Sequence, residues 1–198
     1  MTIDEKKKIL KNEAEEIYND YFISGEVWVF RQLHGDKWFE KYDAFKKFIS
    51  KNLGVHYNDI GIAGSAKLGF SLDPEKELKD FDSESDVDII IVSRTLFERF
   101  WQEYLNDSYN PTTRINNIGK ISFGVFRRYI FLDGFRNNEF YNQWCRKTMG
   151  FENKIQLFFD ISNDIHYRIF ESWDAVKSYY MSSIRASQIH LEGNNASN

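Results

Sequence analysis

The sequence predicts an α+β fold in which a small mixed β-sheet is flanked by α-helices. Three short apolar segments, Asp59–Ala63, Val87–Val92 and Ile165–Phe170, have the composition or the alternation of strands. Stretches with helical spacing of apolar residues lie between and around them. Only 2 prolines and 11 glycines occur in 198 residues, which favours long regular elements over a linker-rich chain.

The first quarter of the chain is predicted to be helical. Apolar residues recur at helical spacings over Asp4–Phe22, and Thr2 with Glu5 forms a capping-box pattern at its start. A second amphipathic helix is predicted over Asp36–Leu53. Residues 1–55 are therefore expected to form an N-terminal helical extension.

The remaining elements are expected around the strands. The Gly64-Ser65 turn opens a short helix after the first strand, and the polar segment Ser71–Glu84 is expected to be an exposed loop. Residues 56–185 form the predicted core, and residues 186–198 form a polar tail. The later segments are a helix over Thr95–Leu105, a loop over Ser108–Gly119, helices over Ile121–Phe131 and Glu139–Phe158, and a last helix over Trp173–Ile189.

Composition narrows the classes of function. The net charge of −4 disfavours general nucleic-acid binding, because nonspecific affinity comes from Lys and Arg on phosphates. Residues 114–185 carry 11 Lys and Arg against 7 Asp and Glu, so this basic part could meet a triphosphate. No apolar run is long enough for a membrane helix. The single Cys145 and the absence of a signal-peptide pattern predict a cytoplasmic protein.

Two short motifs carry the chemistry. Gly64-Ser65 is a turn able to hold a phosphate, and Asp86 and Asp88 stand two residues apart at the start of an apolar strand. Alternate residues of a strand project to the same face, so the two carboxylates are expected side by side. Their mutual repulsion near an apolar core is relieved by a divalent cation. Mg²⁺ prefers one or two carboxylates together with substrate phosphates.

These motifs resemble those of the nucleotidyltransferase superfamily, which includes DNA polymerase β. The resemblance covers Ile60–Ser93 and implies that Gly64 and Ser65 grip a nucleoside triphosphate while Asp86 and Asp88 hold Mg²⁺. Lys67, on the same turn, is expected to meet a phosphate or to point to water. The fold is accordingly expected to be nucleotidyltransferase-like.

Many members of this family have a third carboxylate on a neighbouring strand. Neither face of the predicted strand Ile165–Phe170 offers an acid, which leaves Asp160 and Asp164 as candidates. Alternatively, His166 and Arg168 face the triphosphate, since Arg forms strong charge-assisted bonds with phosphate.

Two functions follow as expectations. The first is a Mg²⁺-dependent nucleotidyltransferase that moves a nucleoside monophosphate from an NTP, expected to be ATP, to a hydroxyl on a protein, a small molecule or an RNA end. The alternative is a catalytically degenerate module that binds nucleotide or a protein partner. Retention of both motifs favours the enzyme, and the missing third acid favours the binding module.

Overall fold

The computed structural model describes the chain except residues 114, 116, 133–137, 197 and 198, and it leaves the side chains of residues 194–196 undescribed. No helix in the described part is both long enough and apolar enough to cross a membrane. The elements occur in the order α1 (Ile3–Ile9), α2 (Ala14–Ile17), η1 (Tyr18–Ile23), α3 (Trp28–His34), η2 (Gly35–Lys37), α4 (Trp38–Leu53), η3 (Tyr57–Asp59), β1 (Ile60–Ala63), α5 (Gly64–Leu68), η4 (Pro74–Lys76), β2 (Val87–Val92), α6 (Arg94–Tyr109), α7 (Ile118–Phe126), β3 (Tyr129–Ile130), α8 (Glu139–Phe159), β4 (Ile165–Phe170) and α9 (Trp173–Ala196).

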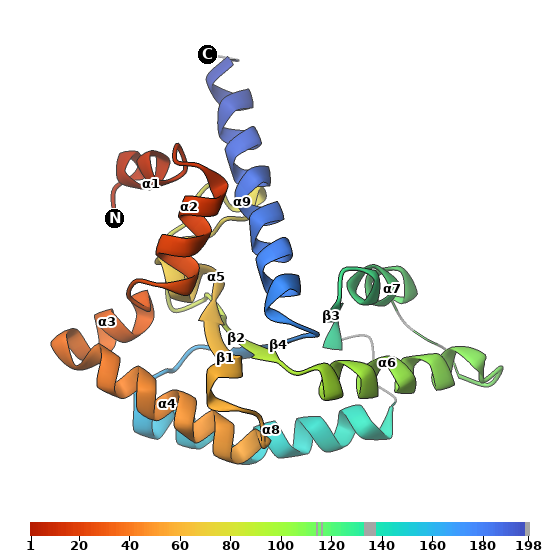
Figure 1. Ribbon diagram of the computed structural model, residues 1–198. Coiled ribbons are helices and arrows are strands. Elements are labelled where there is room, and N and C mark those ends of the chain that lie inside the picture. Colours follow the sequence, from red (N-terminus) through yellow and green to blue (C-terminus); the bar gives the residue numbers. More distant parts are fainter. Residues whose placement is uncertain (114, 116, 133–137, 197–198) are drawn as a thin grey trace.

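The strands form one mixed four-stranded sheet in the order β1-β2-β4-β3 (Figure 1). β1 runs antiparallel to β2, β2 runs parallel to β4, and β3 pairs antiparallel with β4. The parallel pair requires a long connection between β2 and β4, and helices α6 to α8 with the short β3 fill it. The predicted α+β class and the three predicted strands are confirmed.

Each face of the sheet is covered by its own set of helices (Figure 1). Val87, Ile89 and Ile91 of β2 share a core with buried residues of α4, α6 and α8. The alternate residues Ile90 and Val92 belong to a second core with α2 and α9. Asp88 has the same parity as this second pair, so strand alternation directs its carboxylate toward the α9 side.

The predicted N-terminal helix over residues 4–22 is wrong, because the chain breaks it into α1, α2 and the π-helical η1. At the break, the carbonyls of Leu10 and Asn12 accept hydrogen bonds from the Gln188 side chain on α9, at 2.9 Å each. A tertiary contact therefore satisfies the backbone groups that a continuous helix would have paired. The capping box of Thr2 and Glu5 is confirmed.

The helix α3 and the strand β3 were not predicted as separate elements. The helix α3 lies where no element was expected, and α7 ends at Phe126 before the strand β3, which replaces the end of the helix predicted over 121–131. A two-residue strand leaves no periodic pattern, and β3 exists because Tyr129 and Ile130 pair with Phe170 and Ile169. The C-terminal helix α9 also continues past the predicted end at residue 189, into the segment expected to be a polar tail.

The segment 71–84 is not the fully exposed loop that was predicted. Leu72 and Leu78 are buried in the core on the α9 side of the sheet. The Ser187 hydroxyl on α9 donates a hydrogen bond to the Leu72 carbonyl. The segment is thus held against α9 and forms a wall of the site described next.

Candidate functional site

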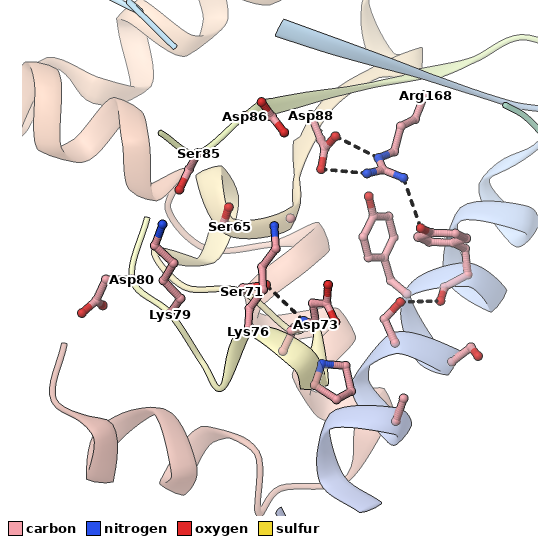
Figure 2. A pocket seen from close by; sticks show the side chains of 18 of the residues that line it. Ser65, Ser71, Asp73, Lys76, Lys79, Asp80, Ser85, Asp86, Asp88 and Arg168 are labelled. Carbon is pink, nitrogen blue, oxygen red and sulfur yellow. Dashed lines mark hydrogen bonds and ion pairs between the residues drawn. The ribbon is translucent and has the colours of Figure 1, made fainter. Parts of the chain in front are cut away.

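A cavity of about 540 Å³ lies between the start of α5, the segment 71–86 and helix α9 (Figure 2). Five of the six predicted site residues line it, namely Gly64, Ser65, Asp86, Asp88 and Arg168. We call it the charged cavity, because its lining includes Lys76, Lys79, Arg168, Asp73, Asp80, Glu84, Asp86 and Asp88.

Gly64 brings the turn after β1 against the carboxylate of Asp88. The register of the antiparallel pair places Ala63 opposite Asp88, so the next residue of the chain passes beside that side chain. A Cβ added to Gly64 would lie 2.8 Å from Asp88 Oδ2, and the Gly64 φ of +63° is one that glycine adopts without strain. The sequence thus needs glycine here for two separate reasons.

Arg168 holds Asp88 from the neighbouring strand. Its Nε and Nη2 donate to the two carboxylate oxygens at 2.9 and 3.3 Å, and its Nη1 donates to the Tyr179 hydroxyl at 3.1 Å (Figure 2). Burial lowers the pKa of Arg168, but the charge of Asp88, the neighbouring Tyr180 and Tyr179 and the hydrogen bond to Asp88 together raise that pKa above its ordinary value. Arg168 is therefore a permanent cation in a bidentate pair, the strong form of such contacts.

Asp86 lies just before β2, and its side chain is 45% exposed, against 16% for Asp88. Its Oδ2 is 3.6 Å from His166 Nδ1, which is an ion pair only when the imidazole is protonated. The two carboxylates thus line one cavity in different states, one clamped by arginine and one open to solvent (Figure 2).

Neither candidate for a third carboxylate lines this cavity. Asp160 caps the C-terminus of α8, with its Oδ2 3.9 Å from His34 Nδ1. Asp164 precedes β4, where its carbonyl accepts from the Val87 amide. No cluster of three or more His, Cys, Asp or Glu suited to a metal occurs among the described residues. Two carboxylates are nevertheless a sufficient protein contribution for Mg²⁺ when phosphates supply further oxygens.

The structure places Lys67 away from the charged cavity. Its Nζ is buried and donates to the carbonyls of Ser24 and Gly25 at 2.9 and 3.1 Å. Residues two apart on a helix point to opposite sides, so Lys67 faces away from Ser65. Burial lowers the pKa of Lys67 to about 8. The prediction that Lys67 points to water is therefore wrong, and Lys67 does not line the cavity that holds the other predicted site residues.

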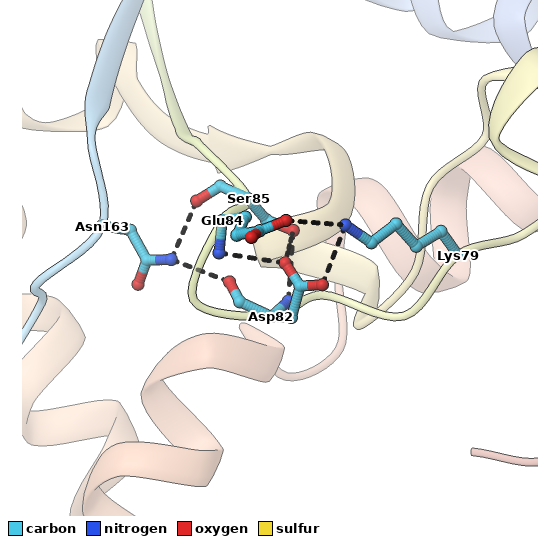
Figure 3. A network of polar contacts seen from close by, with 5 residues as sticks. All are labelled: Lys79, Asp82, Glu84, Ser85 and Asn163. Atoms are coloured by element: carbon cyan, nitrogen blue, oxygen red, sulfur yellow. Dashed lines mark hydrogen bonds and ion pairs between the residues drawn. The ribbon is translucent and has the colours of Figure 1, made fainter.

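The sequence analysis missed the contribution of the segment 71–85. Lys79 Nζ lies 2.8 Å from Asp82 Oδ2 and 3.9 Å from Glu84 Oε2, and the hydrogen bond to Asp82 raises the pKa of Lys79 (Figure 3). Asn163, just before β4, donates to the carbonyls of Asp82 and Ser85 at 2.9 and 2.8 Å. This network ties the segment to the same end of the sheet as Asp86.

Two further groups of the cavity lack a partner within the described residues. Lys76 lies on η4 and points into the cavity without an ion pair (Figure 2). The Tyr180 hydroxyl is buried and makes no hydrogen bond. The alternating charges of residues 75–80 were the only feature of the sequence that could have placed Lys76 at a site. The same pattern is equally typical of a solvated loop.

Comparisons with protein-family models, curated proteins and solved structures give no significant match to this chain. The interpretation of the charged cavity therefore depends on its geometry and chemistry.

Proposed function

We propose that this protein is a magnesium-dependent nucleotidyltransferase, which moves a nucleoside monophosphate from an NTP, expected to be ATP, to a hydroxyl acceptor. The observation that carries the proposal is the close approach of Gly64 to Asp88, with Asp86 on the wall of the same cavity. A phosphate turn and a pair of carboxylates, distant in sequence, thus meet at one place.

The donor set fits the ion that this reaction needs. Asp86 and Asp88 would hold Mg²⁺ through carboxylate oxygens, and the space beside Asp88 that a Cβ at Gly64 would fill stays open. Bound there, Mg²⁺ would offset the negative charge of the triphosphate during transfer. Asp88 retains lone pairs beyond those used by Arg168, because each carboxylate oxygen has two.

The other residues of the cavity would bind and orient the nucleotide. The Ser65 hydroxyl offers a hydrogen bond to a phosphate oxygen, and Lys76 supplies a cation that no carboxylate neutralises within the described residues. Arg168 fixes the rotamer of Asp88 and adds positive charge beside it. Neither of the predicted third acids, Asp160 and Asp164, lines the cavity, so neither is placed to act as a base for the acceptor hydroxyl.

One observation favours a second candidate, a nucleotide-binding module without turnover. The bidentate Arg168 contact occupies both oxygens of Asp88, and an arginine cannot hold a second metal ion. In this candidate, Arg168 neutralises a phosphate, and the module binds nucleotide or a protein partner without turnover.

Label transfer separates the two candidates. Purified protein is incubated with Mg²⁺ and ATP labelled at the α-phosphate, with and without cell lysate, and transfer to acceptors is measured. We expect transfer by the wild type and by the control Glu98→Gln, which changes an exposed carboxylate of α6 outside the cavity, and none by Asp86→Asn. Nucleotide binding without any transfer would favour the second candidate, and equal transfer by Asp86→Asn would overturn the assignment of the site.

A further inference from the structure

A second cavity, of about 570 Å³, lies across the outer edge of β1. Among the described residues, Tyr180 is the one that lines both this cavity and the charged cavity. Its walls come from η1, from α4 and from the start of α9. We call it the aromatic cavity, because its lining includes the rings of Tyr18, Phe22, Trp38, Phe39, Tyr42 and Trp173.

The aromatic cavity is open at its floor because Gly61 has no side chain. A Cβ at Gly61 would stand 3.8 Å from the Trp173 ring and 3.9 Å from Ile90 Cβ, which are ordinary contacts. One wall is fixed to the strand, since the Tyr42 hydroxyl accepts a hydrogen bond from the Ile62 amide at 3.3 Å. The arrangement is a preformed slot between aromatic rings.

The charge of the aromatic cavity has one sign. Lys46 and Lys67 are its only charged lining residues, and neither forms an ion pair within 4 Å among the described residues. Lys67 uses two of its three N–H donors on backbone carbonyls. Lys46 Nζ lies 4.2 Å from the centroid of the Tyr57 ring. Burial lowers the pKa of Lys46, and this effect outweighs the opposite effect of the Asp43 and Asp59 carboxylates.

We propose that the aromatic cavity binds a small planar anion, an aromatic carboxylate or phosphate, whose ring enters between the aromatic walls and whose charge meets Lys46 and Lys67. An anion would supply the counter-charge that these two partly buried ammonium groups lack, and such charge-assisted bonds are strong. Aromatic walls favour a ring over an aliphatic chain. The volume falls within the range of small-molecule sites. This site does not depend on the proposed transferase activity.

Isothermal titration calorimetry with matched probes tests the proposal. The probes are 2-naphthoate, the uncharged 2-naphthamide, the non-aromatic cyclohexanecarboxylate and, for the phosphate case, 1-naphthyl phosphate. We expect at least one of the two aromatic anions to bind roughly tenfold tighter than the amide and the aliphatic acid. Equal binding of 2-naphthamide, or no binding of either aromatic anion at millimolar concentration, would overturn the proposal.

Substitutions locate the binding. Lys46→Gln and Lys67→Met should each raise the Kd of the bound anion roughly tenfold, while Lys47→Gln, on the same helix but exposed and paired with Asp43, should leave it unchanged. Gly61→Ala introduces only ordinary contacts and narrows the floor, so it should weaken binding in a protein that still folds. Unchanged affinity in both Lys46→Gln and Gly61→Ala would place the anion elsewhere and contradict the proposal.

Discussion

The charged cavity and the aromatic cavity both take lining residues from α5, but they differ in how a buried charge is compensated. In the charged cavity, the Asp88 carboxylate is matched by the Arg168 guanidinium on the next strand. In the aromatic cavity, the Lys67 ammonium contacts the carbonyls of Ser24 and Gly25 and no carboxylate among the described residues. The partly buried Asp88 of the first site is thus paired before any ligand arrives, whereas the second site has two lysines and no carboxylate among its lining residues.

One turn of backbone produces this difference. Gly64 and Lys67 are three residues apart on α5, and they line different cavities. The strand β1 ends where its register places Ala63 opposite Asp88, so the glycine meets the carboxylate while the helix carries the lysine to the other side. The comparison teaches that one helix of five residues places Gly64 and Ser65 at the charged cavity and Lys67 at the aromatic cavity.

The largest loss of stability is expected from breaking the ion pair between Arg168 and Asp88. Arg168→Met should lower the free energy of unfolding by about 3 kcal/mol, because Asp88 then stays partly buried without a partner. Urea denaturation measures it, and the double variant with Asp88→Asn should recover most of the loss. A loss in the double variant equal to the sum of the two single losses would show that the pair is not coupled.

A somewhat smaller loss of stability is expected from a substitution at Gly64, in the turn after β1. Gly64→Ala should cost about 2–3 kcal/mol, since it adds strain at positive φ and a Cβ 2.8 Å from Asp88 Oδ2. The matched control is Gly54→Ala, with a φ of +74° and no atom near the new Cβ, which should cost only about 1 kcal/mol. Thermal or urea unfolding compares them. Equal losses would mean that the carboxylate does not restrict residue 64.

The free energy of unfolding should depend on pH through Lys67, which lines the aromatic cavity. The pKa of Lys67 is about 8 in the folded protein, against an ordinary value of 10.5. Between these values the unfolded chain binds more protons, so the contribution of Lys67 to stability rises with pH. Relative to Lys67→Met, the wild type should gain about 2 kcal/mol from pH 8 to pH 10. Parallel curves for the two proteins would contradict a desolvated ammonium.

The smallest effect concerns the wall that the two cavities share. Tyr180→Phe removes a buried hydroxyl that has no hydrogen-bond partner in the described structure, so we expect stability to stay equal or to rise by up to about 1 kcal/mol. Thermal unfolding without ligand measures the change. A clear destabilisation would indicate a partner, such as a buried water, for this hydroxyl.

Local patterns predicted the strands and most of the candidate site. Val87–Val92 and Ile165–Phe170 are strands with the predicted bounds, because runs of β-branched and alternating residues are strong local signals. The motif residues Gly64, Ser65, Asp86 and Asp88 line one cavity as their pattern required. Arg168 stands beside Asp88 because β4 pairs with β2, as was expected if the two strands were neighbours.

What the sequence could not predict depends on contacts between distant segments. The break after α1 is satisfied by Gln188, and the segment 71–84 is held by Ser187, both from the last helix. Lys67 sits on the predicted turn, but its direction is set by the helical rotation of α5 and by the carbonyls of Ser24 and Gly25. None of these partners leaves a periodic signal in the residues that they fix.

Magnesium-dependent binding of ATP to the charged cavity is the most direct test of the proposed function. Calorimetric titration of the wild type with ATP should give binding with Mg²⁺ that is at least tenfold tighter than in the presence of EDTA, and Asp86→Asn should remove this difference. Asp86→Asn is a nearly isosteric change in a side chain that is 45% exposed, so the variant should keep its fold. Binding of ATP that is equally strong with and without Mg²⁺, or unchanged by Asp86→Asn, would contradict the assignment of Asp86 and Asp88 as the magnesium ligands.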